Sequence, residues 1–157
     1  MKTPIFVSDN QEKSNMRQNS VDLIIFVIAN LANLLLIGVF LARAKGLMRV
    51  EYALGLFFIF LALPAGYGAL VNSIHGREWW RILFPLLLVI FCVVELCFDY
   101  IFKLEFRSNK LLWPYLVSFY LATIGMVGYS FGIGKLYGFI TLITYFLNLA
   151  ATWYAHR

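Results

Sequence analysis

Apolar residues come in five long blocks, and short charged or polar stretches separate the blocks. Each block holds about 20 residues, the length of helix that crosses a hydrocarbon core of roughly 30 Å. The chain has 157 residues, of which 62% are hydrophobic and 13% charged, and its mean hydropathy is +0.79. A soluble domain of this size is far less apolar. The blocks therefore predict an all-α, polytopic integral membrane protein that folds as a five-helix bundle.

We expect a single membrane domain, residues 21–157, after a polar N-terminal tail, residues 1–20. The tail lacks the long apolar core and small-residue end of a cleavable signal. It is predicted to be partly disordered, with a short amphipathic surface helix as the alternative. The predicted spans are residues 21–42, 52–74, 80–103, 111–131 and 136–154.

The formal net charge of +5 lies mostly in loops and tails beside the apolar blocks. This placement fits anionic lipid headgroups, so membrane lipids are expected partners and nucleic acid is not. Lys and Arg are more numerous around residues 43–49 and 103–110 than in the other short loops. The positive-inside rule then predicts a cytoplasmic C-terminus and an outer N-terminus in a cell membrane.

The third span carries ionisable residues within its apolar run. Glu95, Asp99 and Lys103 are spaced four apart and so share one stripe of a helix. Carboxylates inside a membrane are costly and usually mark ion or proton sites. Asp99 lies about one turn from Lys103, so an interfacial ion pair accounts for it. Glu95 is therefore the stronger functional candidate.

Amides and a hydroxyl on other spans lie at the depth of Glu95. At about 1.5 Å per residue, Asn33, Ser118 and Asn148 fall roughly 12–15 Å from the same membrane face. Asn30 shares the Asn33 face of the first span. An isolated charge at this depth is unfavourable by several kcal/mol, so Glu95 is expected to be neutral or held by these groups. The sequence predicts an ion- or ligand-binding cluster, and a network that only specifies helix packing is the alternative.

Proline and glycine mark two further features. Pro64 and Gly66 interrupt the second span, where Pro64 frees a backbone carbonyl near mid-membrane. Two interpretations of this interruption remain, namely a kink that helps helix packing and a hinge that allows gating. The fourth span carries small residues near one face, which predicts close packing against a neighbouring helix or a second subunit. These residues are Gly125, Gly128 and Gly132.

Enzymatic chemistry ranks below transport and binding. Residues 128–132 match a Gly-x-Ser-x-Gly pattern, but that elbow follows a strand, and glycines in an apolar helix serve packing. Ser130, His75 and Glu78 lie towards one membrane face, which leaves a serine hydrolase as a minor alternative. A lipid-modifying enzyme would need a nucleophile or a metal motif beside its carboxyl groups.

No metal site and no cofactor are expected. The two histidines, His75 and His156, lie near opposite faces, and no His or Cys has ligand spacing to another. Cys92 and Cys97 lie about 140° apart on one helix, too far around its axis to bridge.

Transport, a channel subunit or ligand binding is therefore the favoured function, with Glu95 responding to protons or cations. The ligand would be a small ion or a small molecule of unknown identity. A homo-oligomer is compatible with five spans per subunit. The rival interpretation is a structural or accessory membrane protein.

Overall fold

The computed structural model describes residues 6–102 and 110–155. This part of the chain is helical throughout apart from short connections, and it contains five helical segments long and apolar enough to cross a membrane. The candidate spans are Gln18–Ala44, Met48–Ile74, Trp79–Ile101, Leu112–Ile133 and Lys135–Ala155. The predicted all-α, five-helix fold of a multi-pass membrane protein is confirmed.

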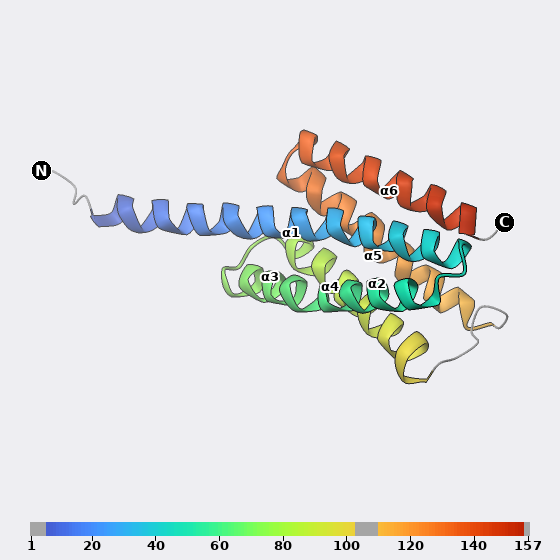
Figure 1. Cartoon of the computed structure of the whole chain (residues 1–157). Coiled ribbons are helices and arrows are strands. Elements are labelled where there is room, and N and C mark those ends of the chain that lie inside the picture. Colours follow the sequence, from blue (N-terminus) through green and yellow to red (C-terminus); the bar gives the residue numbers. More distant parts are fainter. Residues whose placement is uncertain (1–5, 103–109, 156–157) are drawn as a thin grey trace, which may run out of the picture.

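Helix α1 (Phe6–Ala44) is the longest element, and it runs through the predicted boundary between tail and membrane domain. Figure 1 shows its first part extending beyond the rest of the bundle. The expected disorder is not observed over residues 6–20, which are helical. Residues 5–37 contain no glycine or proline, so nothing in the sequence stops the helix before the span begins.

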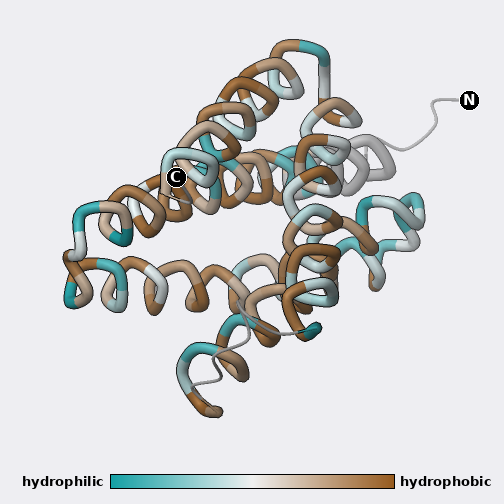
Figure 2. The backbone as a smooth tube through the Cα atoms, turned by 90° about the vertical axis from the view of Figure 1, so that its right-hand side faces the viewer, coloured by the Kyte–Doolittle hydropathy of each residue, from teal (hydrophilic) through white to brown (hydrophobic). Residues whose placement is uncertain are grey.

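The remaining spans pack around the membrane part of α1. Helix α6 (Lys135–Ala155) lies along one side of it and α2 (Met48–Phe60) along another, while α5 (Leu112–Ile133) joins α6 to α4 (Trp79–Glu95). Figure 2 shows that apolar residues occupy most of the helix length. Small and branched residues of α1, among them Ile25, Ala29 and Ala32, form the centre of the core.

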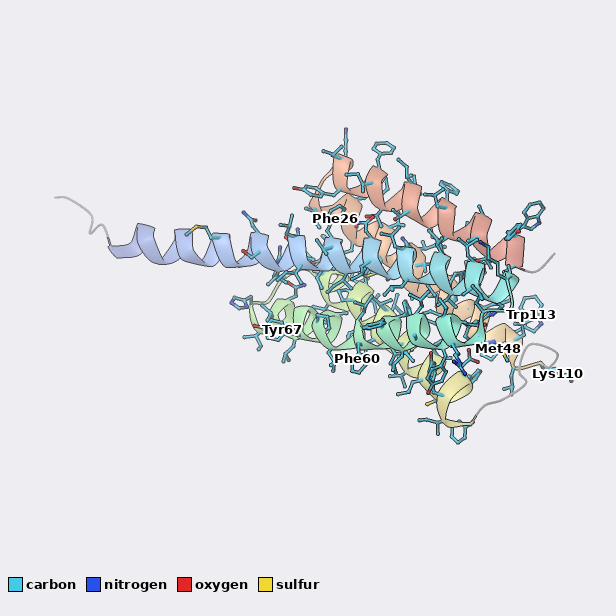
Figure 3. All side chains as sticks on the ribbon, viewed as in Figure 1. Phe26, Met48, Phe60, Tyr67, Lys110 and Trp113 are labelled. Atoms are coloured by element: carbon cyan, nitrogen blue, oxygen red, sulfur yellow. The ribbon has the colours of Figure 1, made fainter. Side chains whose placement is uncertain are left out.

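The outer surface of the bundle is as apolar as its core. Figure 3 shows Phe60 and Tyr67 on the outer side of the second span, and they are 56% and 64% exposed. Other large apolar side chains are similarly exposed along every span. In water such a surface would aggregate, so its natural environment is lipid.

The second span consists of two helices, α2 and α3 (Ala62–Ile74), which meet at Leu61. Pro64 has no N–H to donate to the carbonyl of Phe60, and α2 ends at that residue. The helix resumes with a hydrogen bond from the Ala65 N–H to the Leu61 carbonyl, 3.1 Å long. The interruption therefore lies three residues before the proline. The sequence pattern had predicted it at Pro64 to Gly66.

The glycines of α5 lie against aromatic side chains of α4. A Cβ atom at Gly125 or Gly128 would come within 3.3 or 3.1 Å of the Phe84 ring, and one at Gly132 would overlap the Trp80 ring. The absence of side chains thus lets two aromatic rings rest on the α5 backbone.

The bundle has two ends that differ in chemistry. The Asp22 end contains the start of the α1 span, the connection from α3 to α4 and the turn from α5 to α6. The Glu95 end contains the turn from α1 to α2, the end of the third span and the start of α5. Figure 3 shows Met48, Lys110 and Trp113 at the Glu95 end.

Candidate functional site

A polar cavity of about 290 Å³ lies at the Glu95 end, between α1, α2 and the end of the third span. Glu95, the last residue of α4, forms part of its wall and is 4% exposed. The other polar residues of the wall are Arg43, Glu51, Tyr52, Asp99 and Tyr100. A buried carboxyl group therefore borders a space that has room for a small ion and water.

Carboxyl groups outnumber basic groups in the described wall of this cavity. Glu51, Glu95 and Asp99 contribute three carboxyl groups, and Arg43 contributes one guanidinium. Arg43 is engaged by Glu51, with its Nη2 at 2.7 Å and its Nε at 2.8 Å from Oε1. The electrostatic character of this wall favours cations over anions.

The helix geometry changes directly after Glu95. Residues Leu96–Ile101 form a π-helix, η1, in which the Phe102 N–H bonds the Cys97 carbonyl five residues earlier. Such wide turns are rare, and they occur frequently at functional sites. Here the wide turn carries Asp99 and Tyr100 into the cavity wall next to Glu95.

Tyr100 ties this π-helix to α2. Its hydroxyl donates a 2.8 Å hydrogen bond to the Tyr52 carbonyl, and the two tyrosine rings lie 4.7 Å apart. A side chain at Gly55 would overlap the Tyr100 hydroxyl. Gly55 is therefore the position that lets η1 approach α2 and close this side of the cavity.

Helix α5 supports Glu95 from the other side. The side chain of Tyr115 hydrogen-bonds Glu95, and its ring packs against Phe91 with centroids 5.6 Å apart. The carboxyl group is thus positioned by a buried tyrosine while it borders a polar cavity. Lys103 lies outside the described residues, so its pairing with Asp99 stays a prediction.

The amides predicted to surround Glu95 form a separate cluster between α1, α5 and α6. The Asn30 amide donates to the Thr141 hydroxyl at 3.1 Å, and the Asn33 amide donates to Thr144 at 3.1 Å. Asn148 donates to the Asn33 side-chain oxygen over 3.4 Å. We call this set the amide ladder: Ser130, Thr141, Asn30, Thr144, Asn33 and Asn148.

The amide ladder and the Glu95 cavity share no residue. Neither Asn33 nor Asn148 lines that cavity, and both face each other across the contact between α1 and α6. The Ser118 hydroxyl donates to the Tyr115 carbonyl of its own helix at 2.8 Å. Asn33 and Asn148, which were predicted to lie at the same depth, therefore contact each other, but neither lines the Glu95 cavity.

A second charged cluster lies at the Asp22 end. Asp22 on α1 is 7% exposed and accepts hydrogen bonds from two arginines. Arg77 binds both carboxylate oxygens at 2.7 Å, and Arg81 binds Oδ2 at 2.6 Å. The Tyr129 hydroxyl of α5 adds a 2.7 Å bond to Oδ1. One buried carboxylate thus joins α1, α4, α5 and the connection after α3.

Neighbouring groups hold the two arginines in place. Asn72 accepts from Arg77 at 3.0 Å and donates to the Arg81 carbonyl at 2.8 Å. The Arg81 guanidinium lies 4.4 Å from the Trp80 ring centroid and binds Glu78 at 2.7 Å. Glu78 is outside the spans, and its own backbone N–H and Arg81 lower the pKa of its carboxyl group. Both guanidinium groups are therefore fixed in position.

Sequence reasoning missed this cluster because it counted Arg77 and Arg81 only as loop charges and passed over Asp22. A usable signal was present. Asp22 lies at the start of an apolar span, at the same membrane face as both arginines. If residue depth had been estimated for the ends of the spans as well as for their centres, Asp22 would have been predicted to pair with Arg77 and Arg81.

The arrangement around Ser130 does not resemble a hydrolase site. Ser130 is fully buried and bonds the Met126 carbonyl and Thr141, whereas His75 is exposed and bonds the Val71 carbonyl. Within the described ranges no group of three His, Cys, Asp or Glu side chains is placed to hold a metal ion. Comparisons with protein-family models, with curated proteins and with solved structures find no match.

Proposed function

We propose that this protein binds or transports a small cation, or protons, and that Glu95 is its titratable group. The observation that carries the proposal is the burial of the Glu95 carboxyl group in the wall of a polar cavity at one end of a membrane bundle. A carboxyl group in such a position responds strongly to protons and to cations, because water screens its charge poorly.

The surrounding wall supports a cationic ligand. Glu51 and Asp99 add carboxylate oxygens to the same cavity, and Tyr52 and Tyr100 add aromatic faces. Oxygen ligands and aromatic faces suit alkali cations or a protonated amine. Arg43 is held by Glu51, so a cation can enter without meeting an uncompensated guanidinium.

Movement of α2 would open and close this cavity. Glu51, Tyr52 and Gly55 all belong to α2, and the break at Leu61 separates α2 from α3. An apolar cavity of about 240 Å³ lies next to the break, lined by Phe60, Leu63 and Cys92 among others. We propose the segment from Leu61 to Gly66 as the hinge, because a helix break and a neighbouring void leave room for rotation.

The Glu95 end would face the cytoplasm by the positive-inside rule, with the Asp22 end outside. Cysteine labelling in intact cells tests this orientation. An impermeant thiol reagent should label a cysteine at Gly76 and leave one at Gly46 unlabelled. The reverse pattern would invert the direction in which the cavity opens.

The experiment for the proposed function compares Glu95→Gln with the wild type in proteoliposomes, using cation and proton flux and equilibrium cation binding as readouts. Glutamine keeps the shape and can keep the Tyr115 hydrogen bond, so the fold should persist while pH-dependent flux or binding is lost. Glu78→Gln is the matched control, because Glu78 is an exposed carboxylate at the opposite end. Unchanged flux and binding in Glu95→Gln across pH would refute the proposal.

The structural alternative has one specific observation in its favour. The amide ladder connects α1, α5 and α6 by side-chain hydrogen bonds well inside the bundle, as a network that specifies helix packing would. Under this alternative, removing the titratable proton of Glu95 changes neither flux nor binding. The same experiment therefore separates the two functions.

A further inference from the structure

A second cavity, of about 540 Å³, lies at the Asp22 end. Its wall includes Arg77, Arg81 and their partner Asp22, together with Asn19 and Ser20 of α1, which are exposed. Tyr137 of α6 adds an aromatic ring with a hydroxyl group. Two guanidinium groups thus border a space that is accessible from one end of the bundle and distinct from the Glu95 cavity.

Both guanidinium groups have donors to spare. Together they carry roughly ten N–H groups, and the hydrogen bonds described above use five of them, three from Arg77 and two from Arg81. Arg81 uses only its Nε and one Nη1 hydrogen towards the described residues. The ion pairs with Asp22 hold both guanidinium planes in place, so their other donors are preorganised for a further acceptor.

The charges at this cavity also favour an anion. Arg77 and Arg81 carry two positive charges against the single buried carboxylate of Asp22. Glu78 also binds Arg81, but its side chain is 60% exposed, so water screens its charge. The interior of the cluster is one negative charge short of neutrality, which one monoanion would supply.

The position of the cavity matches the headgroup layer of a bilayer. The first and third spans begin at Gln18 and Trp79, so Asp22 and Arg81 lie within about one turn of the membrane surface. Trp79 is 70% exposed at the same level, as an interfacial anchor would be. A phosphate group of a lipid on this side would meet the cavity at its own depth.

We propose that the Arg77–Arg81 cavity binds a phosphate-class monoanion, either the phosphodiester headgroup of an anionic lipid or free phosphate. The phosphate oxygens accept hydrogen bonds from the spare N–H groups of both arginines, with Ser20 and Tyr137 hydroxyls at the edge of the site. Binding would tie α1, α4 and α6 together at this end.

Isothermal titration calorimetry on the full-length protein, purified in an uncharged detergent, tests the proposal. The titrants are short-chain phosphatidylglycerol, short-chain phosphatidylcholine and inorganic phosphate, with sodium chloride matching the ionic strength. Saturable binding of phosphatidylglycerol alone identifies a lipid headgroup as the ligand. Saturable binding of inorganic phosphate as well identifies the free anion as sufficient. No saturable binding of either overturns the proposal.

Two variants connect binding to the cavity. Ser20→Phe fills the rim without removing an arginine and should abolish binding, whereas Ser73→Phe, an exposed serine of α3 outside the cavity, is the matched control. Arg81→Lys keeps the charge but loses the fork of N–H groups, and it should weaken binding on the order of tenfold. If neither Ser20→Phe nor a folded Arg81→Lys protein weakens binding, the anion binds elsewhere and the proposal fails.

Discussion

The two ends of the bundle each bury a carboxyl group, but the groups that surround the two carboxyl groups differ. At the Asp22 end the carboxylate receives four hydrogen bonds, three from guanidinium nitrogens and one from Tyr129. At the Glu95 end the carboxyl group borders a cavity whose described wall has three carboxyl groups and one guanidinium. The Asp22 carboxylate is fully hydrogen-bonded within the protein, whereas the Glu95 carboxyl group borders an open cavity.

Burial of an acid therefore does not by itself indicate function. Asp22 is nearly as buried as Glu95, and its hydrogen bonds hold four parts of the bundle together. Protonation of Asp22 would remove its ion pairs with Arg77 and Arg81, so this carboxylate is a poor candidate for a group that exchanges protons. Glu95 has a tyrosine partner and borders a cavity, and the proposed function rests on that combination.

The largest effect should come from breaking the Asp22 end. Asp22→Ala leaves two arginines facing each other in a partly buried site, and it should destabilise the protein by about 3–5 kcal/mol, a loss visible as a large drop in Tm in detergent. Glu95→Gln should lower the Tm far less. If both variants unfold alike, the two carboxyl groups have the same structural role.

A matched pair of glycines gives the next largest effect. Gly132 lies under the Trp80 ring at the Asp22 end, and Gly55 lies under the Tyr100 hydroxyl at the Glu95 end. Gly132→Ala should cost about 1–3 kcal/mol, because Trp80 is held by Tyr129 and Arg81. Gly55→Ala should cost less, since only the tip of Tyr100 must move, but it should alter cation binding.

Thermal unfolding with Gly66→Ala as the control checks this pair. A Cβ atom at Gly66 would lie 3.7 Å from Val89, an ordinary contact, so that substitution should be tolerated. Equal gains in stability in all three variants would mean that helix propensity, which favours alanine over glycine, and not the two ring contacts, sets the result.

The smallest effect concerns the amide ladder between the two ends. Asn30 bonds both Thr141 and Thr144, whereas the Asn148 side-chain oxygen is buried with no hydrogen-bond partner among the described residues. Asn30→Leu should therefore lower the stability by about 0.6–1.7 kcal/mol, and Asn148→Leu should lower it less, because Asn148 makes one long 3.4 Å bond to Asn33. Thermal unfolding in detergent measures both, and a greater loss for Asn148→Leu would contradict this account of the ladder.

The sequence predicted the fold because apolar block length alone determines it, and the five spans agree with the structure to within a few residues. It also singled out Glu95, whose position in an apolar helix is visible without coordinates. It could not show that Asn33 and Asn148 face each other, because depth is readable from spacing but the rotation of each helix is not. The sequence also did not predict the π-helix after Glu95, because Leu96–Ile101 contains no glycine or proline that would indicate a change in helix geometry.

Infrared difference spectroscopy of the carboxyl groups, recorded when a cation is added to the protein in lipid, tests whether Glu95 is the cation-responsive group. We expect a change in the protonated-carboxyl C=O band that disappears in Glu95→Gln and persists in Glu78→Gln. The absence of any cation-induced carboxyl band in the wild type, or a band that survives in Glu95→Gln, would contradict this expectation.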